Sequence, residues 1–150
     1  MDVEEAKIES LEFRAKQFRV ALEICERDSL PITFENFPSG SCGDATLLLA
    51  KYLQNSGLGF FDYVCGEIYE DGERKFQSHA WLQREDLIVD ITADQFDEIE
   101  AAVLITRNHS WHNQFEVDVR HLADFEVYDE HTKNTLSSAY NSVVAHIDDI

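Results

Sequence analysis

The first part of the chain has the apolar spacing of helices. Over residues 3 to 27 the apolar positions recur at alternating steps of three and four, which places them on one stripe of a helix. This stripe consists of Ile8, Leu11, Ala15, Phe18, Leu22 and Cys25. Residues 28 to 40 hold both prolines of the chain and are expected to be irregular. A second helix, apolar on most of its sides, is predicted to begin near Cys42 and to end at residues 55 to 57.

The middle of the chain is rich in segments that are typical of strands. Three strands are predicted at about residues 60 to 69, 75 to 83 and 87 to 91. Asp71-Gly72 is a signal for a tight hairpin between the first two strands, and Arg84-Glu85 can close a second hairpin. Further strands are predicted at residues 103 to 106, 115 to 119 and 124 to 128.

The C-terminal segment returns to helical spacing, with Leu136, Tyr140, Val143 and Ile147 on one stripe. Helices that flank an antiparallel meander predict an α+β fold. A length of 150 residues fits one domain over residues 1 to 150, and a hydrophobic content of 44% is sufficient for a packed core.

The second predicted hairpin brings a histidine and a carboxylate together. If Arg84 and Glu85 are its two loop residues, His79 lies directly opposite Asp90, and directly opposed residues have Cβ atoms about 5 Å apart on the same face. That face also carries Trp81 and Ile88, whereas the opposite face carries the core candidates Phe76, Ala80, Leu82, Leu87, Val89 and Ile91. His79 and Asp90 are therefore expected to project together from the less apolar face.

Among the three cysteines, Cys42 has the setting of a nucleophile. It stands where a glycine- and serine-rich segment meets a predicted helix. The free N–H groups and the positive dipole of a helix N-terminus favour a thiolate and can bind a developing oxyanion. Cys25 lies on an apolar stripe and is expected to be a small buried hydrophobe. With Asp71-Gly72 as the turn, Cys65 opposes Ser78 on the core face, which argues against Cys65 as the nucleophile.

Together these residues predict a cysteine enzyme. His79 would take the proton of Cys42, and Asp90 would hold the imidazole in the correct orientation. The thiolate would attack an acyl carbon and form a thioester, which water or an amine then resolves.

Composition narrows the choice of partner and location. The formal net charge is −18, from 30 acidic and 12 basic residues, so nucleic acid and membrane surfaces are not expected as partners. A neutral or cationic substrate, or a basic partner, suits this surface better. Three cysteines without a CxxC spacing form neither a disulfide framework nor a zinc motif. The acidic N-terminus lacks the pattern of a secretion signal, so a cytoplasmic location with free thiols is expected.

Three segments resemble the transglutaminase-like branch of the papain-like cysteine enzymes. They are PSGSCGDATLLLAKYL around Cys42, SHAWLQ around His79 and LIVDITADQF around Asp90, and they lie within residues 38 to 96. Members of this family place the cysteine at the start of a buried helix, the histidine on the next strand and the aspartate on the strand after it. The resemblance implies a papain-like core, with a Cys-bearing helix on an antiparallel sheet, and thioester chemistry on an amide or peptide bond.

The resemblance also suggests residues that bind the substrate or its oxyanion. In papain-like proteases an amide side chain six residues before the cysteine contributes to the oxyanion hole, and Asn36 stands at that position. Gln95 is a second candidate amide. Ser41, beside the nucleophile, and Trp81, in the H-x-W segment, complete the set of residues expected at the site.

A second polar and aromatic cluster follows at His109, Trp111, His112 and His121. His109 and His112 could ligate a metal, but no third ligand at a diagnostic spacing accompanies them. An exposed loop is therefore expected, and a loop that covers the substrate is the alternative. The triad residues could themselves bind zinc, although strong zinc sites show closer ligand pairs. The sequence therefore predicts neither a metal nor another cofactor.

Two functions from different classes follow. The first is a thiol-dependent hydrolase or acyltransferase that acts on an amide or peptide bond of a peptide or protein. The second is a catalytically inactive binding or immunity-type module of the same fold, which would use its acidic surface for a basic protein partner.

Overall fold

The computed structural model describes residues 2–150, apart from the side chains of Arg74 and Phe76, so the core-facing position expected for Phe76 lies outside the described residues. This part of the chain has an α+β fold, as the sequence predicts, with helices packed on a five-stranded antiparallel sheet. The helices are α1 (Val3–Ile24), α2 (Cys42–Asn55) and α3 (Glu130–Val144). The strands are β1 (Asp62–Glu70), β2 (Glu73–Arg84), β3 (Leu87–Asp90), β4 (Leu104–Thr106) and β5 (Glu116–Leu122).

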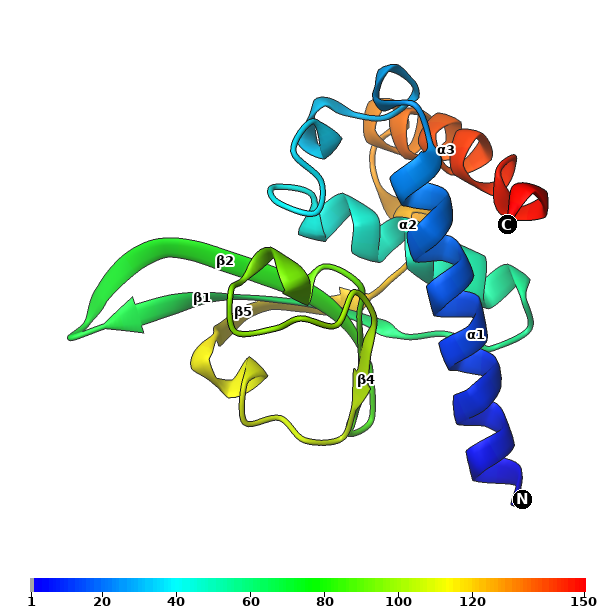
Figure 1. Ribbon diagram of the computed structural model, residues 1–150. Coiled ribbons are helices and arrows are strands. Elements are labelled where there is room, and N and C mark those ends of the chain that lie inside the picture. The colour runs from blue at the N-terminus through cyan, green and yellow to red at the C-terminus, as the bar shows by residue number, and fades with distance from the viewer. Residues whose placement is uncertain (1) are drawn as a thin grey trace.

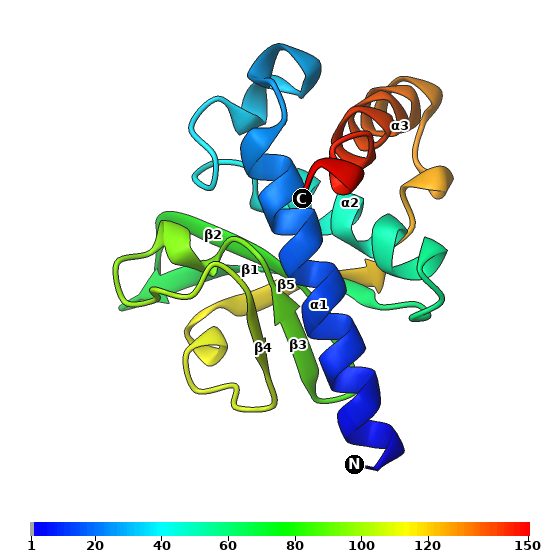
Figure 2. The same cartoon turned by 45° about the vertical axis from the view of Figure 1, so that its right-hand side comes forward.

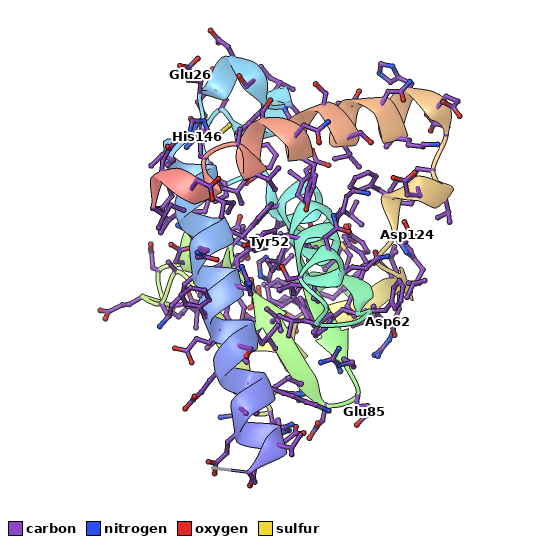
Figure 3. The ribbon with its side chains drawn as sticks, turned by 90° about the vertical axis from the view of Figure 1, so that its right-hand side faces the viewer. Glu26, Tyr52, Asp62, Glu85, Asp124 and His146 are labelled. Carbon is purple, nitrogen blue, oxygen red and sulfur yellow. The ribbon has the colours of Figure 1, made fainter. Side chains whose placement is uncertain are left out.

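α2 lies at the centre of the helical layer. It contacts α1, α3, β1 and β2, and the three helices gather on one side of the sheet (Figures 1 and 2). The predicted stripe of α1 faces this core, because its members from Leu11 to Cys25 are buried. Tyr52 lies on the side of α2 that faces α1 (Figure 3) and stacks on Phe18, with ring centroids 5.2 Å apart.

The strand order is β4-β3-β2-β1-β5, and the two faces of the sheet bury different residues. Leu82 and Val89 are buried in the main core that the helices share, and Ala80 is buried where its carbonyl accepts the Thr46 hydroxyl of α2. Trp81 and Ile88 belong to a second apolar cluster, together with Val64 and Phe115. The loop between β4 and β5 runs on the side of the sheet away from α2 (Figures 1 and 2), and its Trp111 packs against this second cluster.

The second hairpin turns one residue later than the sequence suggests. Arg84 pairs with Leu87, so Glu85 and Asp86 form the turn, and Glu85 has a φ of 54°. Arg84 stays in the strand because its guanidinium donates to the carbonyl of Leu58 at 2.7 Å and lies over the Phe61 ring. The expected direct opposition of His79 and Asp90 is therefore wrong. Because the register moves by two positions, both side chains keep the predicted face.

The first hairpin follows the prediction only near its turn. Asp71 and Gly72 have φ angles of 53° and 80°, as a tight hairpin requires, and Glu70 pairs with Glu73. An irregularity of β1 between Glu67 and Tyr69 then shifts the register. Cys65 consequently opposes Ala80 rather than Ser78, although it stays on the face toward α2.

The strand expected at residues 124 to 128 is wrong. These residues form a short 3-10 turn at Phe125–Val127, because the Asp124 carboxylate accepts the N–H of Glu126 at 3.0 Å. The turn directs the Phe125 side chain into the core. Within residues 2–150, the structure contains no helix with the length and apolarity needed to cross a membrane.

Candidate active site

β2 and β3 hold His79 and Asp90 in direct contact. Nε2 of His79 lies 2.7 Å from Oδ2 of Asp90, and both side chains are fully buried. A carboxylate can only accept, so the imidazole donates Nε2–H to it. The contact runs diagonally across the two strands rather than between opposed positions, and the length of a histidine side chain bridges that difference.

The pair is electrostatically coupled. Burial alone would lower the pKa of His79. The charge and hydrogen bond of Asp90, together with a smaller contribution from Cys42, outweigh burial and raise the pKa to about 9. Burial likewise opposes ionisation of Asp90, but the charge of His79 and hydrogen bonds from His112 and His79 lower the pKa of the carboxyl to about 2. At neutral pH the two residues therefore form an imidazolium–carboxylate pair.

Cys42 is the first residue of α2 and is half-buried. Its side chain lies near enough to His79 to contribute to the raised pKa of the imidazole. Asp90 occupies Nε2, so Nδ1, which also faces the Gln95 amide, is the ring nitrogen left for the thiol. An imidazole between a cysteine and an aspartate is the arrangement that a Cys-His-Asp triad requires.

The other two cysteines lack this arrangement. Cys25 is buried at the end of α1, as expected. Cys65 is half-buried, and burial followed by the nearby charge of Cys42 raises the pKa of its thiol. A raised pKa leaves less thiolate at neutral pH, which disfavours Cys65 as a nucleophile.

Gln95 is the predicted substrate-binding residue that reaches the imidazole. Its side-chain nitrogen lies 3.2 Å from Nδ1 of His79 and 3.1 Å from the carbonyl of Thr92. The amide N–H can donate to Nδ1 of a neutral imidazole. When Nδ1 is protonated, the amide oxygen must turn toward it, so Gln95 can adapt to either state of His79.

Trp81 forms a wall of the site. Its indole N–H donates to Gln83 at 3.2 Å, and its ring lies 5.9 Å from that of His79. Three further aromatic rings surround the imidazole, with centroids 5.2 to 5.7 Å from it: Phe96, Trp111 and Phe115. These rings exclude water from the His79–Asp90 hydrogen bond.

The structure places Asn36 and Ser41 in other roles. Asn36 is exposed in the turn before α2, where its carbonyl accepts the N–H of Ser39. Ser41 is buried directly before Cys42, and its hydroxyl donates to the carbonyl of Pro38 at 3.2 Å. Ser41 therefore shapes the start of α2, whereas no hydrogen bond among the described residues links the Asn36 side chain to the triad.

The expectation of an exposed loop at residues 109 to 112 is wrong for His112. Its side chain is buried, and Nε2 lies 2.8 Å from the same Asp90 oxygen that binds His79. His109 is half-buried rather than exposed, and its Nε2 lies 2.6 Å from the carbonyl of Asp86. The sequence contained no spacing signal for the His112 contact, because a loop delivers it to Asp90 from 22 residues away.

His79, Asp90 and His112 are the described residues that together could hold a metal ion. Ligand atoms about 2.0–2.1 Å from a tetrahedral zinc lie roughly 3.3 Å from one another. Here the two nitrogen–oxygen distances are 2.7 and 2.8 Å and converge on one oxygen. Such distances are typical of charge-assisted hydrogen bonds, so the arrangement fits a hydrogen-bonded cluster better than a metal centre.

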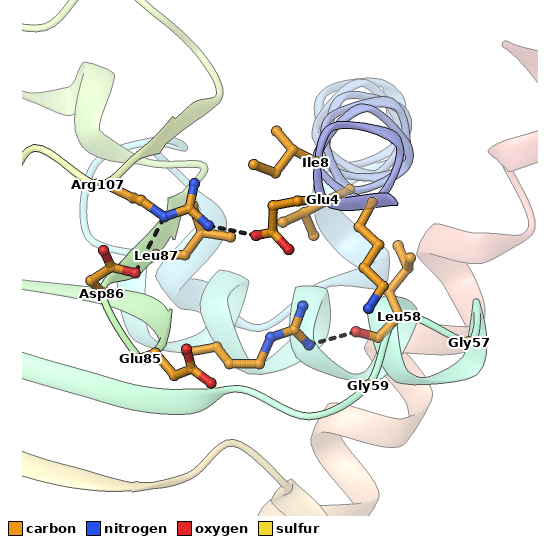
Figure 4. A pocket seen from close by; sticks show the side chains of 12 residues that line it. Glu4, Ile8, Gly57, Leu58, Gly59, Glu85, Asp86, Leu87 and Arg107 are labelled. Atoms are coloured by element: carbon orange, nitrogen blue, oxygen red, sulfur yellow. Dashed lines mark hydrogen bonds and ion pairs between the residues drawn. The ribbon is translucent and has the colours of Figure 1, made fainter. Parts of the chain in front are cut away.

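A cavity of about 490 Å³ lies apart from this site, between the start of α1, the α2–β1 loop and the β2–β3 turn (Figure 4). Two arginines that line it already have partners. Arg107 contacts Glu4 at 2.6 Å and Asp86 at 3.3 Å, and Arg84 donates to the carbonyl of Leu58. None of the residues that line this cavity is Cys42, His79 or Asp90.

Comparisons of the chain with family models, with curated proteins and with solved structures give no match.

Proposed function

We propose that the protein is a thiol-dependent hydrolase or acyltransferase that cleaves an amide or peptide bond through a thioester intermediate, with a papain-like active site. One observation carries the proposal. The His79 imidazole donates Nε2–H to Asp90 at 2.7 Å, and Cys42 is near enough to raise the pKa of the same imidazole.

The chemistry follows from these contacts. In the resting site Nδ1 of His79 holds the proton that Cys42 has given up, so that a thiolate faces an imidazolium that Asp90 stabilises. The thiolate attacks the acyl carbon, and the C–N bond breaks as Nδ1 returns the proton to the leaving nitrogen. Water or an amine then attacks the thioester, with His79 again as the base, and the free thiol of Cys42 is regenerated.

The start of α2 and Gln95 are suited to stabilise the oxyanion. The first backbone N–H groups of a helix lack intrahelical partners, and Cys42 stands at that end of α2. The side-chain amide of Gln95 lies beside the reacting edge of the imidazole. Ser41 contributes by fixing the backbone immediately before the nucleophile.

The acidic composition favours a basic peptide or protein as the substrate. A net charge of −18 attracts cationic partners and repels nucleic acid and anionic membranes. The three described cysteines are free, which is compatible with the reducing cytoplasm that we propose as the location.

Iodoacetamide labelling of the native protein tests the proposal without knowledge of the substrate. We expect Cys42 to react selectively and to remain reactive down to acidic pH, as a thiolate does. His79→Ala should lower the rate at pH 7 by about thirtyfold, because an ordinary thiol is only a few per cent ionised there. Cys65→Ser is the matched control and should label like the wild type.

Slow labelling of Cys42, at the same rate as Cys25 and Cys65 in the unfolded chain, would contradict the proposal. That result would instead favour the inactive binding module of the same fold. A screen of amide, thioester and peptide substrates then identifies the acyl donor for a reactive Cys42.

A further inference from the structure

A second histidine contacts the triad aspartate. The loop between β4 and β5 carries His112 inward, where its side chain is 2% exposed. Nε2 of His112 lies 2.8 Å from Oδ2 of Asp90, the oxygen that His79 also contacts. The triad mechanism gives His112 no task, although its contact with Asp90 is nearly as short as that of His79.

Asp90 receives three hydrogen bonds that fix its orientation. The N–H of Thr92 donates to Oδ1 at 3.1 Å, and the two histidines donate to Oδ2. Rotation of the carboxylate would break all three contacts in a site where water cannot replace them. Without His112, the contact to His79 alone would hold Oδ2 in place.

One nitrogen of His112 is committed to Asp90. Nε2 donates to the carboxylate, because a carboxylate can only accept. Nδ1 is buried and has no hydrogen-bonding partner among the described residues. The His112 side chain therefore makes its hydrogen bond to Asp90 rather than to any other described residue.

Neighbouring contacts keep the His112 ring in place. The rings of Trp81 and Trp111 pack against it at 4.8 and 4.9 Å between centroids. The indole N–H of Trp111 faces Glu98 at 3.4 Å, and His109 ties the same loop to the β2–β3 turn. The titratable groups placed against His112 are Asp90 from β3 and His79 from β2.

We propose that His112 is a positioning residue of this site: it locks Asp90 in the orientation that braces His79, and the β4–β5 loop therefore completes the active site. This inference rests on the proposed function, because a positioning residue needs a reaction to serve. The hydrogen bond by which His112 holds Asp90, which we call the lock, is a property of the folded protein and can be measured separately.

Two variants that differ by one methylene group provide the test. In His112→Gln the amide nitrogen reaches the position of Nε2, whereas in His112→Asn the same amide is too short to reach Asp90. His112→Leu removes the donor altogether. His109→Gln is the loop control, because His109 belongs to the same loop but contacts only the Asp86 carbonyl in the described chain.

The first readout is the pH profile of Cys42 alkylation. We expect His112→Asn and His112→Leu to react about tenfold more slowly at pH 7, with the profile moved toward that of an ordinary thiol. His112→Gln and His109→Gln should stay within about twofold of the wild type. Asn and Leu variants that match the wild type, or a folded Gln variant as impaired as the Asn variant, would overturn the proposal.

The second readout is the low-field proton signal of the His79 Nε2–H in NMR spectra, which needs no reactive thiol. It should persist in His112→Gln and be lost or exchange-broadened in His112→Asn. If wild-type Cys42 is unreactive but this signal follows the prediction, the proposed function fails and the lock stands. If the signal is unchanged in the Asn variant, the lock itself is refuted.

Discussion

The two faces of the sheet bury very different chemistry. The face toward the helices is filled by aliphatic and aromatic residues such as Leu82, Val89 and Phe18. The opposite face buries His79, Asp90 and His112 inside a ring of aromatic side chains. Apolar burial supplies the free energy of folding, whereas buried ionisable groups are kept only where they satisfy one another. Apolar packing and the buried ionisable cluster thus lie on opposite faces of one sheet. We therefore expect substitutions on the helix-covered face to lower stability most, and substitutions in the cluster to change the reactivity of Cys42.

The largest expected effect is on the stability of the helix-covered face. Phe18 is completely buried, so Phe18→Ala should lower the free energy of unfolding by about 3–5 kcal/mol. Phe13, on the exposed side of the same helix, is the control, and Phe13→Ala should change it by less than about 0.5 kcal/mol. Urea unfolding measures both. A folded Phe18→Ala protein should still label at Cys42 as the wild type does, and selective loss of labelling would break the separation of the two faces.

The next effect is the pH dependence that the His79–Asp90 pair gives to stability. The pKa of Asp90 is lowered, so the contribution of the pair is present above about pH 4 and is lost as the pH falls through about 2. The pKa of His79 is raised, so the contribution is present below about pH 6.5 and is lost as the pH rises through about 9. The difference in unfolding free energy between wild type and Asp90→Asn should therefore peak between these limits, at about 1.5–3 kcal/mol.

A series of urea unfolding curves from pH 3 to pH 10 checks this prediction. The acidic surface of the protein contributes to both curves, so their difference isolates the pair. A difference that keeps growing above pH 9 would show that the pair does not carry the positive charge assigned to His79.

A smaller effect is expected on reactivity in the same variant. Asp90→Asn keeps the shape of the side chain but removes the charge that stabilises the imidazolium. Cys42 should therefore label about tenfold more slowly at pH 7, a milder loss than in His79→Ala, because the imidazole itself remains. Mass spectrometry of the labelled peptide measures the alkylation rate of each variant and shows which variant loses more. Equal losses in Asp90→Asn and His79→Ala would mean that Asp90 serves to position His79 rather than to stabilise its positive charge.

The smallest expected effect is that of metal removal. Because the contacts of His79, Asp90 and His112 have hydrogen-bond lengths, EDTA should leave the melting temperature and the labelling rate of Cys42 within error. Thermal unfolding followed by circular dichroism, before and after chelation, measures this. A clear fall in melting temperature that zinc reverses would make these residues a metal site and would move His112 from a positioning role to a ligand role.

Much of the fold and part of the site could be predicted because they depend on local pattern. The stripe of α1, the start of α2 at Cys42 and the turn at Asp71-Gly72 each follow from spacing or from the backbone freedom of single residues. The prediction that His79 and Asp90 share a face is correct although the predicted turn position is wrong. The register differs from the predicted one by two residues, and side chains in a strand alternate with a period of two. The turn at Phe125–Val127 was missed, because a side-chain cap at Asp124 overrode the apolar spacing.

The sequence alone therefore determined which residue types stand on each helix stripe and strand face, and it brought forward Cys42, His79 and Asp90 as chemical candidates. Only the tertiary structure decided the contacts that complete the cluster: the diagonal bond from His79 to Asp90, the approach of Gln95 to the imidazole, and the burial of His112 against the carboxylate. The physical reason is that periodicity constrains near neighbours in the chain, whereas loop closure and side-chain packing select contacts between distant segments, for which the spacing of residues carries no signal.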